Sequence, residues 1–580
     1  MKRLNNAAWS IILGTIVLLS PLPAPAAESS DDNNQASDSQ DQDKEKEESK
    51  SKDDDKKNAK GDKSKKKDNK SKDKEDDDAK LSTTEHTTII AGKAVKYKAT
   101  AGYIVLKDFS EKRKADSDSS GDDKSGSKNK KDGKEPKKLA KMFFIAYTRE
   151  DAGSVSKRPI TFSFNGGPGS ASVWLHMGAL GPRKAALTAR GEAPPPPYRL
   201  EDNTESWLDA SDLVFIDPVS TGFSRTEPGE DPKKFHGYDE DIESVGEFIR
   251  LYTTKYERWT SPKFVVGESY GTTRAAGLSE YLQNRFGLYL NGIILVSAVL
   301  NWQTIDFSPG NDTPYALYVP SDTAAAWYHR KLPADLQSKP LDDVLHQAEN
   351  FVAQEYLHAL YEGDRLSQER KEEVANRLAS FIGLPAGYVL QLNIRVPDHL
   401  FFTHLLMDKN RQLGRYDARY SGIRYNPGQD RSDYDPSFEA VHGPFTAAFN
   451  DYIRRDLHFK SDLPYETLAN VWPWSFKRAE NSYLNVADDL RKAMTRNPYL
   501  KVWLCCGVYD LATPYFAAKS TVDQMFLDPS IRKNVKITYY DSGHMMYVYQ
   551  PAREKFKADF ISFLKDALVP ENSVVPSAAP

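Results

Sequence analysis

One five-residue segment carries the spacing expected of a catalytic nucleophile. Gly267-Glu268-Ser269-Tyr270-Gly271 follows a short apolar run, residues 263–266, and precedes a helical pattern over residues 272–286. A serine between two glycines at a strand–helix junction is typical of a nucleophile elbow, a sharp turn that exposes the hydroxyl group. The alternative is an ordinary glycine-rich turn, because the pattern alone also occurs by chance. The position between strand and helix favours the elbow.

An elbow serine needs a base and an acid further along the chain, in the order serine, acid, histidine. His544 directly follows the apolar run 535–540, and Asp510 lies four residues past the run 502–506. Loops at the carboxyl ends of strands carry the sites of open α/β sheets. His544 would accept the proton of Ser269, and Asp510 would orient the imidazole. The alternatives are a surface histidine, an Asp510 that only caps a helix, and Asp541 as the acid.

The reaction of such a serine also needs hydrogen-bond donors for an oxyanion. The apolar run 160–164 leads into Asn165-Gly-Gly-Pro-Gly-Ser170, whose glycines let backbone N–H groups approach a reacting carbonyl. The second donor expected in this architecture is the backbone N–H of Tyr270. Together the three segments predict a serine hydrolase.

The elements that must hold these segments alternate between strand and helix. Apolar runs at 160–164, 213–216, 264–266, 293–296, 502–506 and 535–540 predict buried parallel strands, and 241–256, 272–286 and 552–568 predict helices. This rhythm stops near Trp302, and the following stretch contains helical patterns at 341–360 and 368–382. We therefore expect an α/β-hydrolase doubly wound sheet with a largely helical cap insertion. The core occupies 83–301 and 486–568, the cap 302–485 and a loose tail 569–580.

Two strongly charged segments interrupt the globular composition. Residues 28–80 hold 19 acidic and 15 basic side chains, and residues 111–138 hold 7 and 10. Such segments bury too little apolar surface to fold, so we expect disorder over 27–82 and a disordered loop over 111–138. This loop would separate a hairpin at 87–106, with Gly102 near its turn, from a strand at 142–147.

The composition also limits the classes of partner. A formal net charge of −4 argues against a nucleic-acid binder, and no internal apolar run is long enough for an integral membrane span. No metal-ligand spacing, phosphate loop or dinucleotide motif is present, so we expect neither metal nor cofactor. Cys505 and Cys506 are adjacent, which excludes a disulfide framework.

The N-terminus has the pattern of an export signal. Lys2 and Arg3 precede an apolar stretch, and Ala24-Pro25-Ala26 provides a small-residue cleavage site. We expect a signal peptide over 1–26 and a periplasmic or extracellular protein. The alternative, an N-terminal membrane anchor, would need a longer apolar stretch.

Several segments in order along the chain resemble the serine carboxypeptidase family, especially its bacterial relatives. They are Asn165-Gly-Gly-Pro-Gly, Leu180-Gly-Pro, Phe215-Ile-Asp-Pro-Val-Ser-Thr-Gly-Phe-Ser224, Gly267-Glu-Ser-Tyr-Gly271, Gly507-Val-Tyr-Asp510, Gly543-His-Met and Gln550-Pro551. The glutamate directly before the serine is the most specific of these features.

The resemblance implies a role for each of seven residues. Ser269, Asp510 and His544 would form the catalytic triad, the N–H groups of Gly167 and Tyr270 the oxyanion hole, and Asn165 and Glu268 the site for the substrate's terminal carboxylate. The chain departs from the family pattern in three places. Ser170 replaces a cysteine, Asp217-Pro218 lacks an intervening glutamine, and Ala179 stands where an acidic residue pairs with the glutamate before the nucleophile.

The function expected from these observations is that of an exported serine carboxypeptidase-like exopeptidase. Its substrates would be peptides, from which it releases the C-terminal amino acid through an acyl-enzyme on Ser269. The alternatives are another hydrolase of this fold, an esterase or an aminopeptidase, and a non-catalytic adhesion module. Glu268 beside Ser269 favours the carboxypeptidase.

Overall fold

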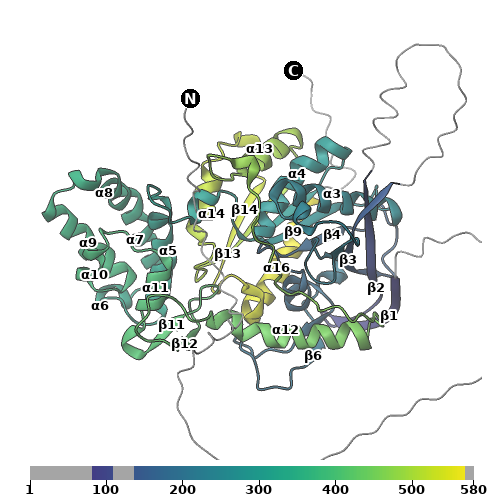
Figure 1. The fold of residues 1–580 in the computed structure, drawn as a ribbon, viewed down its shortest axis with the longest axis horizontal. Coiled ribbons are helices and arrows are strands. Elements are labelled where there is room, and N and C mark those ends of the chain that lie inside the picture. Colours follow the sequence, from purple (N-terminus) through teal and green to yellow (C-terminus); the bar gives the residue numbers. More distant parts are fainter. Residues whose placement is uncertain (1–80, 109–135, 569–580) are drawn as a thin grey trace, which may run out of the picture. The chain divides into compact units, whose positions relative to one another are not determined.

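The computed structural model of the protein describes residues 81–108 and 136–568 (Figure 1). The predicted signal peptide over 1–26 and the predicted tail over 569–580 lie outside these residues, as do most of the two charged segments. Both charged segments were predicted to extend too far. Leu81 and Ser82 already belong to the first strand, and Lys137 and Lys138 belong to the third, because these residues pair with neighbouring strands.

Ten strands of the described residues form one sheet in the order β1-β2-β3-β7-β4-β9-β10-β13-β14, with β8 paired to β3 (Figure 1). Their bounds are β1 Leu81–Ile90, β2 Lys93–Asp108, β3 Lys137–Arg149, β4 Ile160–Phe164, β7 Asp212–Ile216, β8 Arg225–Thr226, β9 Lys263–Ser269, β10 Gly292–Ala298, β13 Lys501–Gly507 and β14 Val535–Tyr540. From β7 to β14 all neighbours are parallel, whereas β1, β2 and β3 run antiparallel and β3 joins β7 antiparallel.

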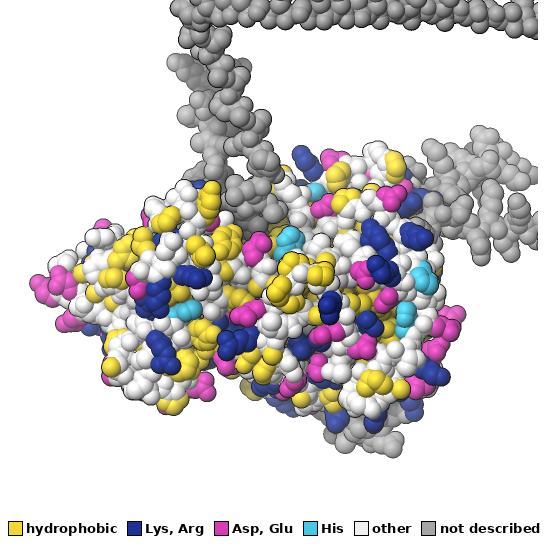
Figure 2. All heavy atoms as spheres, turned by 90° about the horizontal axis from the view of Figure 1, so that it is seen from below, with side chains coloured by type: hydrophobic (Ala, Val, Ile, Leu, Met, Phe, Trp, Pro, Cys, Tyr) yellow, Lys and Arg dark blue, Asp and Glu magenta, His cyan; other side chains and the backbone are white. Residues whose placement is uncertain are grey.

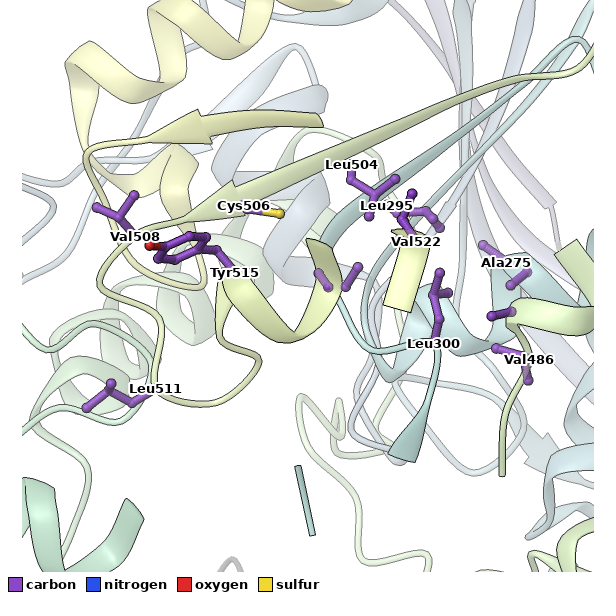
Figure 3. Packing of buried hydrophobic residues seen from close by; sticks show 14 of the residues in the cluster. Ala275, Leu295, Leu300, Val486, Leu504, Cys506, Val508, Leu511, Tyr515 and Val522 are labelled. Atoms are coloured by element: carbon purple, nitrogen blue, oxygen red, sulfur yellow. The ribbon is translucent and has the colours of Figure 1, made fainter. Parts of the chain in front are cut away.

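The inner parallel strands are short and largely apolar because the sheet is covered on both faces there. Leu295 and Leu504 point into one core cluster, which Figure 3 shows together with Val522 from a covering helix. The next residues back along the same strands, Ile294 and Trp503, point into the second cluster on the opposite face. The doubly wound α/β sheet predicted from the sequence is therefore confirmed.

Helices cover both faces of this sheet. α3 (Tyr238–Lys255), α4 (Tyr270–Phe286), α13 (Ala487–Arg496) and α14 (Tyr515–Asp523) contribute to the first core cluster. α12 (Pro436–Arg455) and α16 (Gln550–Ala567) contribute to the second. The helices expected at 241–256, 272–286 and 552–568 are confirmed, with boundaries that differ by at most three residues.

The predicted hairpin has a different turn. β1 and β2 are joined at Ala91 and Gly92, which have φ angles of 48° and 76°. Gly102 lies inside β2, where it pairs with Leu81 on one side and Phe144 on the other. Placing the turn at Gly102 was wrong because β2 continues through this glycine, whereas the left-handed backbone of a two-residue turn occurs at Ala91 and Gly92.

The region after Trp302 is largely helical, and Figure 1 shows its first helices gathered beside the sheet. They are α5 Thr313–Tyr328, α6 Ala334–Gln337, α7 Leu341–Phe351, α8 Leu357–Glu362, α9 Gln368–Ile382, α10 Ala386–Gln391 and α11 Asp398–His404, followed by the strands β11 Arg411–Leu413 and β12 Ser421–Ile423. The helix predicted at 341–360 is divided by a π-helical turn, Val352–Tyr356. The helix predicted at 368–382 has the same bounds as α9, because Ser367 caps its start and Gly383 turns left-handed at its end.

The remaining short elements lie mainly between β4 and β7. They are α2 (Val173–Leu175), a π-helical turn (His176–Leu180), β5 (Arg183–Ala185) and β6 (Leu200–Asp202), with α15 (Pro529–Arg532) before β14. The boundaries of the cap insertion at 302 and 485 stay a prediction.

Candidate active site

The elbow predicted around Ser269 has the expected geometry. β9 ends on Ser269, whose φ and ψ are 59° and −129°, and α4 begins at the next residue. A side chain with positive φ is strained, so surrounding contacts must hold this conformation. A Cβ atom on Gly267 would lie 2.0 Å from the carbonyl oxygen of Gly271, so the crossing needs a glycine there. Ser269 is half-buried, while Glu268 and Tyr270 on either side are buried.

The predicted acid and base are in direct contact. His544 Nδ1 lies 2.7 Å from Asp510 Oδ2, and both residues are buried. The other carboxylate oxygen of Asp510 accepts hydrogen bonds from the backbone N–H groups of Ala512 and Thr513, at 2.8 and 3.0 Å. Asp541, the alternative acid, is exposed and lies beside Tyr509 instead. The geometry therefore favours Asp510 as the partner of His544.

Thr513 also contacts this pair, and the sequence analysis did not single it out. Its hydroxyl donates to Asp510 Oδ2 at 2.8 Å and lies 3.2 Å from His544 Nδ1. An aspartate three residues before a threonine is typical of a local side-chain turn, which is the signal that would have identified it. Burial opposes a charge on His544, but the Asp510 carboxylate outweighs this effect and raises the pKa of His544 above its usual value.

The loop that carries His544 lies next to the elbow. Ser297 donates a hydrogen bond to the carbonyl oxygen of His544 at 2.6 Å, and its neighbour Ala298 pairs in register with Ser269. Among the described residues, the hydroxyl of Ser269 and the imidazole of His544 do not hydrogen-bond each other. Catalytic hydrogen bonds of unliganded enzymes are often loose and tighten when substrate binds.

The predicted oxyanion loop packs closely against the start of α4. A Cβ atom on Gly166 would lie 2.4 Å from the backbone nitrogen of Tyr270, so only glycine permits this approach. Gly167 has a φ of 101°, which glycine tolerates. The structure therefore brings the loop of Gly167 to the backbone nitrogen of Tyr270, the two groups expected to hold an oxyanion.

A buried ion pair that the sequence analysis missed holds this loop in place. Arg274 Nη1 donates to the carbonyl oxygen of Asn165 at 2.7 Å, and Arg274 Nε lies 2.8 Å from Asp241 Oδ2. Tyr270 donates to the same aspartate oxygen at 3.1 Å. No local sequence pattern indicates this cluster, because it joins α3, α4 and the loop after β4.

Glu268 and Asn165, the residues expected to bind a terminal carboxylate, lie near each other beside the elbow. Burial raises the pKa of Glu268 to about 7, although its polar neighbours and His544 lower it. The hydroxyl of Tyr547 also donates to Glu268 Oε2, at 2.7 Å. Ala179 is buried and supplies no carboxyl group.

A segment from the helical region holds both loops of the acid–base pair. We call residues 415–419 the strap. The carbonyl oxygen of Tyr416 accepts the backbone N–H of His544 at 2.6 Å, and that of Arg415 accepts the N–H of Leu511 at 3.1 Å. Asp417 Oδ2 accepts the N–H of Gly543 at 3.0 Å. The ring of Tyr416 lies 5.1 Å from that of His544. The strap therefore fixes the backbone on both sides of the site.

Residues 81–108 and 136–568 contain no cluster of His, Cys, Asp and Glu side chains that could hold a metal ion. No helix within the same ranges has the length and apolar character needed to cross a bilayer. Cys505 and Cys506 are both free and buried. On the face shown in Figure 2, Lys and Arg side chains are interspersed with Asp and Glu side chains, rather than gathered in one basic surface.

Comparison with known proteins identifies a family model and several relatives that are similar to part of this chain. The family model described as serine carboxypeptidase matches residues 133–305. The pheromone-processing carboxypeptidase KEX1 of Saccharomyces cerevisiae is 32% identical over 142 residues, which cover 22% of this chain and 17% of KEX1. Serine carboxypeptidase-like 34 of Arabidopsis thaliana is 29% identical over 159 residues, covering 26% of this chain and 30% of the plant protein.

The crystal structure of Kex1, a prohormone-processing carboxypeptidase from Saccharomyces cerevisiae, aligns with 82% of this chain and 93% of that chain. The sequence identity is 16% and the TM-score 0.44. The family match contains Ser269 and the predicted oxyanion loop and ends before Asp510 and His544. The resemblance to the serine carboxypeptidase family that the motifs indicate is thus confirmed over residues 133–305.

Proposed function

We propose that the protein is an exported serine carboxypeptidase that removes single amino acids from the C-termini of peptides. The observation that carries this proposal is the buried Glu268, which directly precedes Ser269, accepts a hydrogen bond from Tyr547 and lies near Asn165. The substrate of an esterase or an aminopeptidase places no terminal carboxylate beside the nucleophile, so such an enzyme needs no carboxylate-binding group there. The contact between Asp510 and His544 supports the hydrolase chemistry, and the N-terminal sequence pattern supports export.

In the proposed acylation step, Ser269 Oγ attacks the carbonyl carbon of the last peptide bond. Its proton passes to Nε2 of His544, because Nδ1 faces Asp510. The N–H groups of Gly167 and Tyr270 donate to the developing oxyanion. The C–N bond then breaks, the leaving amino group takes the proton from His544, and the C-terminal amino acid departs.

The proposed deacylation step repeats this sequence with water. His544 accepts a proton from the water as its oxygen attacks the acyl carbon. The bond to Ser269 Oγ breaks and the serine regains its proton. The products are the shortened peptide and free enzyme, and no other reactant is needed.

The protonation states of Glu268 and His544 limit the working pH. A substrate carboxylate beside Glu268 requires the protonated glutamic acid, which predominates below about pH 7. His544 must be neutral, which requires a pH above its raised pKa. The two groups interact, so the observed limits belong to the pair. We expect a bell-shaped profile for peptides, with a maximum in the mildly acidic to neutral range.

Digestion of defined peptides tests this proposal. Peptides with free or blocked ends are incubated with the protein and with Ser269→Ala, and mass spectrometry shows which end shortens. Loss of C-terminal residues in the unmutated protein alone supports the carboxypeptidase. Loss of N-terminal residues would indicate an aminopeptidase, and cleavage of esters alone an esterase. Failure of a fluorophosphonate to label Ser269 would favour a non-catalytic adhesion module.

A further inference from the structure

The side chain of Glu268 has one hydrogen-bond donor and a second polar neighbour. Tyr547 donates its hydroxyl to Oε2 at 2.7 Å. Asn165 is the polar neighbour, and its side-chain oxygen accepts the backbone N–H of Leu175 at 3.1 Å. Tyr547 holds Oε2, so the other carboxylate oxygen of Glu268 is the one that can face a ligand. This orientation depends on the position of Tyr547.

The position of Tyr547 depends on two neighbouring elements. The residue belongs to a single helical turn, Met546–Val548, that follows His544 and packs on the π-helical turn His176–Leu180. Its ring is fully buried. A Cβ atom on Gly178 would lie 2.4 Å from this ring, so glycine at 178 leaves the space that the ring fills. The next residue, Ala179, offers no acidic group, and a hydroxyl from the His544 loop is the partner of Glu268 instead.

We propose that Tyr547 is a positioning residue, whose hydroxyl fixes one oxygen of Glu268 so that the other meets the terminal carboxylate of a bound peptide. This inference rests on the proposed carboxypeptidase function and deepens it. Tyr547 lies three residues after His544, so one loop supplies the catalytic base and orients the group that recognises the substrate's end.

The hydroxyl also affects the charge of Glu268. The titratable groups that face this carboxyl are His544, Asp510, Tyr547 and Tyr416. A donor stabilises the carboxylate form, so Tyr547 lowers the pKa of Glu268 while burial raises it. Removal of the hydroxyl takes away one effect that lowers the pKa of Glu268, so this pKa rises. Glu268 then stays protonated to higher pH.

The experiment compares Tyr547→Phe with the unmutated protein, using a peptide and its C-terminal amide and measuring kcat/KM against pH. Phenylalanine keeps the ring that fills the pocket. For the peptide, we expect the alkaline limb to move up by about one to two pH units, the shift corresponding to one lost hydrogen bond to a charged group. We also expect KM to rise severalfold, since Glu268 is less well oriented. The amide carries no terminal charge, so its profile should not move.

The matched control is Tyr540→Phe. Tyr540 is also buried and precedes His544 by four residues, but its hydroxyl donates to Asp559. This variant should leave both profiles unchanged. Fluorophosphonate labelling of Ser269 verifies that each variant is folded. If Tyr547→Phe does not fold, Gly178→Ala provides the test, because its methyl group would displace the ring while the hydroxyl is retained, and it should move the same limb upward.

Two failures can be distinguished. Identical pH profiles for the peptide and the amide in the unmutated protein would refute the proposed function itself. A second outcome is that the peptide and amide profiles differ in the unmutated protein and that Glu268→Gln alters them. If a folded Tyr547→Phe then leaves the profiles unchanged, only the role of Tyr547 is overturned.

Discussion

Replacing Asp510 by asparagine tests the central contact of the site with little change in shape. The retained carbonyl oxygen can still accept the backbone N–H groups of Ala512 and Thr513. The new NH₂ group faces Nδ1 of His544, where the carboxylate oxygen accepted a hydrogen bond before. An amide donor there favours the tautomer with the proton on Nε2, the nitrogen that must accept the proton of Ser269.

The expected loss follows from this tautomer change. Exchange of the corresponding acid for its amide in a well-studied triad lowers kcat by ~10⁴, and we expect a similar loss here. At 1.36 kcal/mol per factor of ten, this loss is about 5.5 kcal/mol of transition-state stabilisation. The free energy of unfolding should change by only about 1.5–3 kcal/mol, the value of one hydrogen bond to a charged group.

The assay is the acylation rate with an activated ester under single-turnover conditions, combined with thermal unfolding. Asp541→Asn is the control, since it makes the same chemical change at an exposed residue of the His544 loop. The control should keep the activity of the unmutated protein. If Asp510→Asn retained more than about a tenth of the acylation rate, the assignment of Asp510 as the orienting acid would be wrong.

Three further sets of variants have defined outcomes. Ser269→Ala and His544→Ala should each abolish nearly all steady-state turnover, and the double variant should be little worse, because the two residues act as one unit; additive losses would contradict this. Glu268→Gln always carries a donor, so it should flatten the alkaline limb of kcat/KM for a peptide and lower the peak, whereas an unchanged limb would exclude a role for this carboxyl. Replacing residues 111–136 by a short Gly/Ser turn should leave turnover within a few-fold and the melting temperature nearly unchanged, because Asp108 and Lys137 on either side pair directly. A large loss of rate with an unchanged melting temperature would show that this segment reaches the site.

The fold and the contact between acid and base were accessible from the sequence for a definite physical reason. Ser269 ends the parallel strand β9, and Asp510 and His544 follow the parallel strands β13 and β14. Such strands leave apolar runs that end in glycine or polar residues. Strand ends at one edge of a sheet lie close together, so residues far apart in sequence could be assigned to one site.

The contacts that hold the site could not be predicted in the same way. Tyr547 meets Glu268 only after η10, the turn Met546–Val548, packs against the π-helical turn near Gly178, and neither turn has a periodic pattern. The sequence does not distinguish Arg274 from an exposed polar residue of a helix, because its burial against Asp241 depends on the packing of α3 and α4. The misplaced hairpin turn has a similar origin, because only strand pairing distinguishes the glycine inside β2 from the one at the turn.

The strap has a consequence for how peptides enter the site. Because residues 415–419 hydrogen-bond the backbones of both catalytic loops, a rigid swing of this part of the helical region would pull His544 away from Asp510. Opening for substrate must therefore come from segments that do not touch these loops. Substitutions in the helices around the strap should therefore disturb the acid–base pair less than substitutions within residues 415–419.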